Sequence, residues 1–273
     1  MGMRRGLAVL ALALLAAQVS ADDGAYLLHA AGCIACHTAK DGVPLAGGRA
    51  FETPNGVFYS PNITPDPETG LGRWTREQFV RALREGVAPD GSAYFPVFPY
   101  PSYRLMSERD AGLIYDHLMS LPAVRQANRA HALPWWLARW QMKPWQWWVL
   151  PAAAPLPADD RGRYLVEALG HCGECHTPRN RLGILDRTRH LAGTRDGPDG
   201  GAVPNITPDR DSGIGRWRAD DLVYFLETGA LPDGDYTGGS MVDVIEHGTS
   251  RLTPADREAI ADYLRRVPAL PGP

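Results

Sequence analysis

The pentapeptide Cys33-Ile34-Ala35-Cys36-His37 recurs once, as Cys172-Gly173-Glu174-Cys175-His176, and the two copies contain all four cysteines of the chain. Two thiols three positions apart with a histidine directly behind them form the attachment signature of a c-type haem. One helical turn presents both sulfurs to the haem vinyl groups and directs the imidazole at the iron. The sequence therefore predicts two covalently bound haems, with His37 and His176 as proximal iron ligands.

Three other chemistries use closely spaced cysteines. A thioredoxin-like dithiol lies at a strand-to-helix junction of a βαβ unit. A zinc site combines two CxxC pairs, or one pair with a distal histidine pair. Two structural disulfides are the third alternative. None of these explains a histidine immediately after both pairs, so the pattern favours haem.

Residues 1–21 have the three parts of a secretory signal peptide. Arg4 and Arg5 supply the basic start, residues 7–17 the apolar run and residues 19–21 a small-residue cleavage site. The run is shorter than the roughly 20 apolar residues that a membrane helix needs. We therefore expect export to the periplasm, with any contact to the inner membrane being peripheral.

The charge balance argues against a nucleic-acid partner. The chain has 28 Lys and Arg against 31 Asp and Glu, a formal net charge of −3. A nucleic-acid-binding protein would show a clustered basic face. The sequence also lacks phosphate loops, dinucleotide fingerprints and nucleophile elbows. Any redox chemistry is therefore expected to belong to the iron.

A second repeat follows each pentapeptide. Pro61-Asn62-Ile63-Thr64-Pro65-Asp66 recurs as Pro204-Asn205-Ile206-Thr207-Pro208-Asp209, and each copy continues to Gly-Arg-Trp, ending at Trp74 and Trp217. The period is far longer than the roughly 20 to 50 residues of a solenoid repeat, so it indicates duplicated domains. The predicted organisation is domain 1 at 22–122, a connector at 123–160 and domain 2 at 161–273.

The pattern within each half is helical. Hydroxyl caps, capping boxes and terminal glycines mark the expected helices. No stretch alternates convincingly as a strand would, so the expected fold class is all-α, with helices around one haem in each half. The expected helices are 75–85 and 107–121 in the first half, and 219–228 and 253–267 in the second.

The connector holds six of the eight tryptophans: Trp135, Trp136, Trp140, Trp145, Trp147 and Trp148. One interpretation is that these rings pack the two domains together, because aromatic side chains bury large areas. The other is a docking face for a partner protein or for a membrane surface, where tryptophan is also enriched. The sequence leaves both open.

The sixth iron ligand decides what each haem can do, because a methionine fills the site whereas an open site admits small molecules. Beyond residue 21 the methionines are Met106, Met119, Met142 and Met241. Met241 follows a glycine-rich stretch, so we expect a flexible strand to bring it to haem 2. For haem 1 we expect Met106, with His29 or His117 as alternatives.

The loops 62–69 and 205–212 have two interpretations. They are either ordinary proline-bounded turns, or seals at the haem edge that present donors from Asn62, Asn205, Trp74 and Trp217.

Further residues accompany these motifs, namely Leu45-Ala46-Gly47-Gly48 after the first pentapeptide and Phe98-Pro99-Tyr100 before a predicted helix. With them, nearly the whole mature chain resembles the cytochrome c subunits of bacterial membrane-associated dehydrogenases. Such subunits serve quinoprotein alcohol dehydrogenases, flavin-dependent sugar-acid dehydrogenases and molybdenum hydroxylases. The resemblance implies two tandem class I-like cytochrome c domains. It also implies electron transfer from a dehydrogenase catalytic subunit toward quinone or a terminal oxidase.

The chain departs from the family pattern in two places. Many relatives have a third haem and a membrane-anchoring tail, whereas this sequence ends at Pro273, and relatives often carry methionine where Phe98 stands. We predict an electron carrier that is not itself an enzyme. The main alternative is a dihaem peroxidase or oxidase with an open distal site at haem 1. A third is a structural adaptor that binds its partner through the connector.

Overall fold

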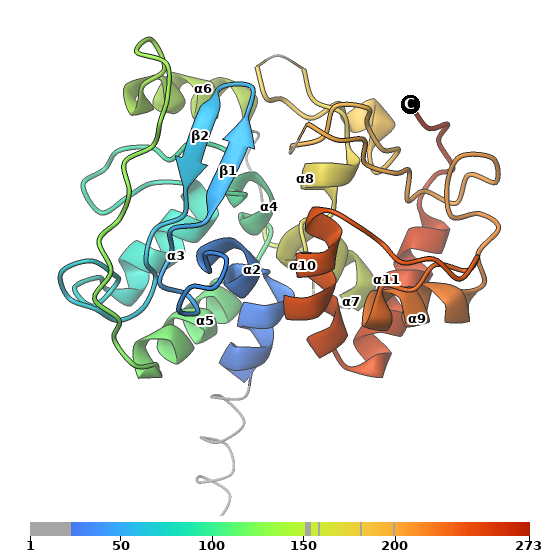
Figure 1. Cartoon of the computed structure of the whole chain (residues 1–273), viewed down its shortest axis with the longest axis horizontal. Helices are drawn as coiled ribbons and strands as arrows, with labels where there is room; N and C mark the ends of the chain where they lie inside the picture. The colour runs from blue at the N-terminus through green and yellow to red at the C-terminus, as the bar shows by residue number, and fades with distance from the viewer. Residues whose placement is uncertain (1–22, 151–153, 158, 181, 199) are drawn as a thin grey trace, which may run out of the picture.

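The computed structural model describes residues 23–150, 154–157, 159–180, 182–198 and 200–273. The predicted signal peptide, residues 1–21, lies outside the described residues. The N-terminal and C-terminal halves lie side by side, and helices of both meet in the middle of the molecule (Figure 1). None of the helices in the described part of the chain is long and apolar enough to cross a bilayer.

The elements follow in chain order. The first half contains a helical stretch at 23–30, α2 (Cys33–His37), β1 (Ala50–Thr53), β2 (Gly56–Tyr59), α3 (Arg76–Glu85), α4 (Tyr100–Tyr103) and α5 (Glu108–Ser120). The connector contains η1 (Arg139–Gln141) and α6 (Met142–Val149). The second half contains α7 (Arg161–Arg163), the π-helix η2 (Tyr164–Leu169), α8 (Gly173–His176), η3 (Arg187–Arg189), α9 (Ala219–Thr228), α10 (Ser240–His247), η4 (Thr249–Arg251) and α11 (Pro254–Arg266).

The four expected helices form where their end residues predict them. Thr75, Ser107 and Thr253 each accept a hydrogen bond from the backbone N–H three positions on, at the starts of α3, α5 and α11. Gly86 and Gly229 end α3 and α9 with φ angles of 66° and 76°, a left-handed conformation that glycine adopts without strain. These expectations are confirmed.

A two-stranded hairpin is the element that the sequence did not predict. β1 and β2 are antiparallel, with Ala50 opposite Tyr59. Val57 exchanges backbone hydrogen bonds of 2.9 and 2.8 Å with Ala132, so the connector covers the other edge of β2. Strands of four residues are too short to show clear alternation. The all-α expectation is corrected to a mostly helical fold with one small sheet.

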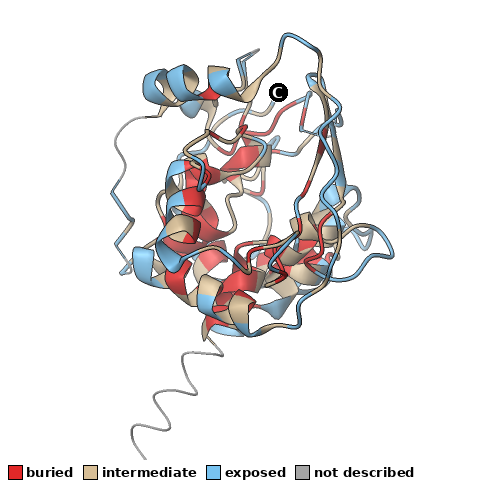
Figure 2. Cartoon of the chain, turned by 90° about the vertical axis from the view of Figure 1, so that its left-hand side faces the viewer, coloured by how far each residue is buried: buried red, intermediate tan, exposed pale blue. Residues whose placement is uncertain are grey.

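The two halves share one apolar core. Buried side chains of 23–30, α3 and α5 join those of η2, α9 and α11 in a single cluster, and the buried stretches face inward in Figure 2. At the seam α2 contacts α10 and α4 contacts η2. Ser102 Oγ donates to Glu174 Oε1 at 2.6 Å there, and the Tyr164 hydroxyl donates to Asp110 Oδ2 at 2.6 Å. The halves therefore pack directly against each other, and the domain limits given above stay a prediction.

Most of the connector tryptophans face solvent. The exposed fractions are 95% for Trp135, 51% for Trp136, 74% for Trp140, 87% for Trp147 and 68% for Trp148. Trp145 is half-buried, and its Nε1 donates to the carbonyl of Leu182 in the second half at 2.9 Å. The interpretation that these rings pack the halves together therefore holds only for Trp145.

Candidate haem sites

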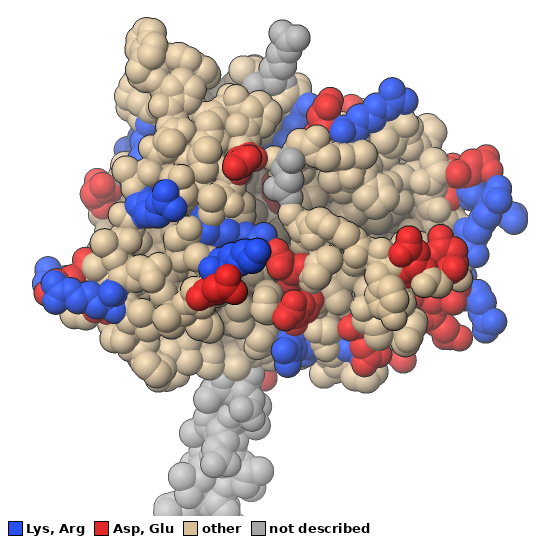
Figure 3. Space-filling view, in the orientation of Figure 1, with Lys and Arg blue, Asp and Glu red and all other residues tan. Residues whose placement is uncertain are grey.

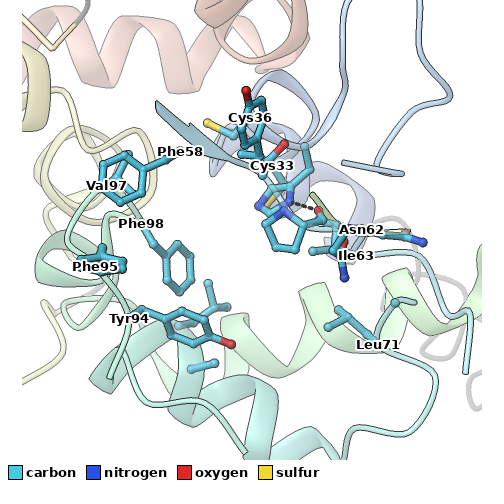
Figure 4. A pocket seen from close by; sticks show the side chains of 18 of the residues that line it. Cys33, Cys36, Phe58, Asn62, Ile63, Leu71, Tyr94, Phe95, Val97 and Phe98 are labelled. Atoms are coloured by element: carbon cyan, nitrogen blue, oxygen red, sulfur yellow. Dashed lines mark hydrogen bonds between the residues drawn. The ribbon is translucent and has the colours of Figure 1, made fainter. Parts of the chain in front are cut away.

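α2 places the sulfurs and the imidazole of the first pentapeptide against one cavity. Gly32 precedes the helix with a φ of 66°, and Cys33, Cys36 and His37 all line the cavity. Nδ1 of His37 lies 2.8 Å from the carbonyl oxygen of Pro61, the contact drawn as a dashed line in Figure 4. Because a carbonyl can only accept, Nδ1 carries the proton and Nε2 keeps its lone pair for a metal.

The second pentapeptide repeats this arrangement. His176 ends α8, and its Nδ1 lies 2.8 Å from the carbonyl oxygen of Pro204. Pro61 and Pro204 open the two copies of the second repeat, which therefore orients the two histidines. Burial lowers the pKa of His37 and of His176, and the hydrogen bond to the proline carbonyl only partly opposes it. Both imidazoles are therefore neutral, the form that ligates metals.

The asparagine side chains of the second repeat form hydrogen bonds within the protein, so they have no amide hydrogen left for a haem. Asn62 Nδ2 donates to Val124 O at 2.7 Å and to Thr69 Oγ1 at 3.0 Å, which uses both amide hydrogens. Asn205 Nδ2 likewise donates to Leu270 O at 2.7 Å and to a serine hydroxyl in its own loop. Each loop is thereby tied to the segment after the last helix of its half. The idea that these amides donate to the haem is corrected.

The first-half cavity has a volume of about 460 Å³. Its walls are mainly aromatic and aliphatic, and in Figure 4 Phe58, Phe98 and Tyr94 lie across the space from Cys33 and Cys36. An apolar cleft of a few hundred Å³ with a few placed polar groups is typical of a cofactor site. Two thiols, an oriented neutral imidazole and apolar walls fit a covalently attached haem.

The thiols do not suit the competing chemistries. Burial raises the pKa of Cys33 and of Cys172 to about 12. A redox-active dithiol needs a lowered thiol pKa, because the thiolate is the nucleophile. Among the described residues there is also no group of three or more His, Cys, Asp or Glu side chains that could hold a metal ion. The dithiol and zinc alternatives are therefore disfavoured.

Met106 does not line the first-half cavity. Its side chain is fully buried in the core that the halves share. The described residues that line the cavity include no methionine, and neither His29 nor His117 is among them. Phe98 and Tyr94 project from the wall opposite the pentapeptide instead (Figure 4). Met106 therefore occupies a packing position, which does not favour it as the sixth ligand of haem 1.

His131 is a second imidazole in this cavity wall, and it comes from the connector. Its Nδ1 accepts a hydrogen bond from the backbone N–H of Tyr59 at 3.1 Å. A neutral imidazole that accepts at Nδ1 carries its proton on Nε2, which then has no lone pair for iron. Burial lowers the pKa of His131, which favours this neutral form. This tautomer does not suit His131 as an iron ligand.

Arg139 is a cavity residue that the sequence analysis missed. Its Nε donates to Ala93 O at 2.9 Å, and its guanidinium carbon lies 4.8 Å from the centre of the Tyr94 ring. Its Nη2 is buried without a hydrogen-bond partner. Leaving a buried donor unpaired costs roughly 1–3 kcal/mol, and more for a charged group. The carboxylates of a bound haem would supply an acceptor of the required charge.

Met241 is the second residue of α10 and is half-buried. The flexible strand expected there is a helix. α10 contacts α9 and also α2 of the other half, where Asp243 pairs with Arg49 at 2.6 Å. The pairing of Met241 with His176 stays a prediction.

The two attachment segments meet at His171. This residue immediately precedes Cys172, and its φ of 39° is left-handed. A side-chain carbon placed on Gly32, which immediately precedes Cys33, would lie 3.7 Å from Nε2 of His171. The imidazole also packs edge-on against the Tyr103 ring, with centroids 5.3 Å apart. The residues just before the two motifs are therefore neighbours, and a methyl group on Gly32 would reach van der Waals range of His171.

Comparison with known proteins agrees with two attachment motifs on one chain. No protein-family model matches the sequence. It is 42% identical over 263 residues to a "Diheme cytochrome c-type" protein of Cereibacter sphaeroides, and the match covers 92% of this chain and 86% of the relative. The chain belongs to the family of dihaem c-type cytochromes. It accordingly carries two covalently bound haem c groups.

Other relatives of this dihaem cytochrome are subunits of dehydrogenases. It is 39% identical to the gluconate 2-dehydrogenase cytochrome c subunit of Pantoea cypripedii over 98% of its length. It is also 39% identical to the cytochrome c subunit of the quinone-dependent alcohol dehydrogenase of Gluconobacter oxydans, over 91% of its length. The chain spans 66% and 55% of the lengths of these two relatives. The family resemblance seen in the sequence is confirmed.

Proposed function

We propose that this dihaem cytochrome relays single electrons in the periplasm from a dehydrogenase catalytic subunit toward quinone or a terminal oxidase. The relatives support the first partner, because several are named as cytochrome subunits of dehydrogenases. Bound haem supplies one-electron chemistry, while the protein supplies binding, orientation and tuning of the potential.

The residues assigned to each haem follow the two motifs. Cys33 and Cys36 would hold haem 1, and His37 would ligate its iron. For haem 2 the corresponding residues are Cys172, Cys175 and His176, with Met241 as sixth ligand. Each proximal histidine is held by a proline carbonyl 2.8 Å from Nδ1, which fixes the ring and its tautomer.

The position of His171 is the main observation that supports the relay. The segments that precede the two attachment motifs are neighbours there, and Cys33 and Cys172 both pack on the core that the halves share, so haem 1 and haem 2 would be attached to adjoining parts of one core. The Tyr103 hydroxyl donates to Ala31 O at 2.5 Å, and Tyr103 also lines the haem 1 cavity. Electrons could then pass between the haems without a change in protein conformation.

A peroxidase or oxidase is the second candidate, and the haem 1 cavity is the observation that favours it. The described lining residues offer no methionine, and the side chains across the cavity from Cys33 and Cys36 include Phe98 and Tyr94. Burial raises the pKa of Tyr94, so its phenol stays protonated and is a poor ligand. In this candidate haem 1 would take a small molecule and haem 2 would deliver electrons.

Reductive titration with a peroxide assay separates the two candidates. For a relay, the purified two-haem protein accepts and returns two electrons reversibly, and the reduced protein consumes hydrogen peroxide no faster than a small monohaem cytochrome c. Catalytic peroxide consumption, with haem 1 binding cyanide, would contradict the relay and support the peroxidase.

A further inference from the structure

α6 is held to the body of the protein by one face. Met142 is buried in a small apolar cluster with Phe58 and Phe95. One turn further on, Trp145 donates to the second half, and Gln146 Nε2 donates to Gly86 O at 3.1 Å. These positions have the i, i+3, i+4 spacing of one helix face. The orientation of the opposite face is therefore fixed.

That opposite face is aromatic where a surface helix is normally polar. It consists of Lys143, Pro144, Trp147 and Trp148, all exposed. α6 stands at the top edge of the molecule in Figures 1 and 2, with its outer surface open to solvent. Burying such rings would be favourable, because apolar surface leaving water contributes about 25 cal/mol per Å².

Neighbouring residues extend this surface. We define the tryptophan face as the five exposed rings of Trp135, Trp136, Trp140, Trp147 and Trp148. In Figure 3 the tip of the lobe that carries α6 shows no charged side chain. Exposed apolar patches of this kind mark sites that bind another protein or a membrane.

The charge of the segment distinguishes between these two partners. Residues 123–158 contain four Lys and Arg side chains and no Asp or Glu, although acidic residues outnumber basic ones in the whole chain. Of these four, Arg125 pairs with Glu68, and Arg129 and Arg139 lie in the wall of the haem 1 cavity. Lys143 is exposed on α6, beside the tryptophan face, and is the basic side chain that a headgroup would meet. Lipid headgroups that are anionic attract such side chains by about 1 kcal/mol each at the membrane surface.

We propose that the tryptophan face docks on the surface of a lipid bilayer that contains anionic headgroups. Tryptophan is enriched at the headgroup level of membranes, where an amphipathic ring suits the boundary between lipid and water. Lysine at the same depth keeps its ammonium group in water while its stem lies along the apolar layer. The protein would lie on the membrane without crossing it.

The docking would also orient the relay, and this step rests on the proposed function. Arg139 belongs to the same segment as the tryptophan face and lies in the wall of the haem 1 cavity. Haem 1 would therefore face the bilayer, where a lipid-soluble quinone is the available acceptor.

Vesicle flotation tests the docking. The two-haem protein is mixed with vesicles of phosphatidylcholine alone or with phosphatidylglycerol added, and the haem absorbance that floats is measured. The test variant is W147S/W148S. The matched control is Tyr224→Ser, which removes another exposed aromatic ring, 57% exposed, from α9 in the second half. Haem content and reversible reduction are measured in every sample.

We expect the wild type and Tyr224→Ser to float with the anionic vesicles, and W147S/W148S to partition about tenfold less, because two aromatic faces no longer bury apolar area. Lys143→Glu should weaken flotation most at low salt, where charges are least screened.

No flotation of the wild type, or equal flotation of W147S/W148S, overturns the proposal. Wild-type protein that stays in solution but binds a purified dehydrogenase subunit through the same rings would make the face a protein interface. Normal reduction in samples that do not float would leave the relay proposal intact.

Discussion

At the scale of single residues, His171 has two features that each cost free energy, and it lies where the two attachment segments are neighbours. A left-handed φ at a non-glycine residue costs about 1–3 kcal/mol, and an unpaired buried polar atom costs a similar amount. Such costs persist where the surroundings hold the residue in place, frequently at functional sites. We interpret His171 as a residue that positions the two haems relative to each other.

Substitution of His171 should therefore affect exchange between the haems. We expect His171→Ala to slow the electron exchange observed after flash reduction, because a void replaces packed atoms between the two segments. His171→Phe keeps a ring there and should restore most of the rate. His117→Ala, on α5 and away from the contact, is the control. Equal rates in all three variants, with unchanged potentials, would exclude the positioning role.

Methionine substitution tests the sixth ligands. The far-red charge-transfer band of the oxidised protein reports iron bound by methionine sulfur. We expect one such haem in the wild type, loss of the band in Met241→Ala, and no change in Met106→Leu, because Met106 lies in the core. A band that survives Met241→Ala, or disappears in Met106→Leu, would contradict the assignment.

At the scale of elements, helix caps connect sequence to stability. Ser107 Oγ accepts from Asp110 N at 3.0 Å and caps α5, whereas Ser120 lies exposed at the other end of the same helix. Ser107→Ala should lower the free energy of unfolding by about 1 kcal/mol. Ser120→Ala should change it by less than about 0.5 kcal/mol. Urea denaturation of both variants provides the comparison, and equal values would mean that the cap contributes nothing.

The long capped helices were predictable because their signals are local. Thr75, Ser107 and Thr253 act on backbone groups within one turn, so periodicity and caps were sufficient. The hairpin was missed because its two strands have only four residues each, and the contact that covers β2, at Ala132, comes from far away in sequence. The helix α10 was missed because the glycines before Met241 suggested a flexible segment.

The residues of the haem sites also fall into two groups: those that local sequence predicts, and those that distant parts of the chain bring in. The cysteine and histidine positions follow from spacing, and the repeated proline carbonyls explain the second repeat. Arg139 and His131 reach the haem 1 cavity only because the connector folds back over the first half, which no local pattern indicates. Met106 lies close to a helix cap in sequence, but it does not line the cavity.

At the scale of the whole molecule, Asp256 helps to join the halves. Its Oδ2 accepts from Tyr26 of the first half at 2.5 Å and from Arg161 at 2.6 Å. Burial alone would raise the pKa of Asp256, but these hydrogen bonds lower it below 3.8. A carboxylate with a lowered pKa stabilises the fold above its unfolded-state pKa, and this contribution is lost as the pH falls through the folded-state value.

Asp256→Asn should therefore be less stable than the wild type near pH 7, and the difference should shrink below about pH 4. Urea unfolding at several pH values, followed by the haem absorbance, measures this difference. A constant difference across the acid range would show that the charge of Asp256 contributes nothing.

The central claim is that two haems on one chain exchange electrons through a fixed protein contact. The most direct measurement injects one electron into the oxidised protein with a photoreductant and follows its redistribution between the haems at several protein concentrations. The relay predicts a first-order phase whose rate does not depend on protein concentration, because the transfer occurs within one molecule. A redistribution rate that rises in proportion to protein concentration would contradict it.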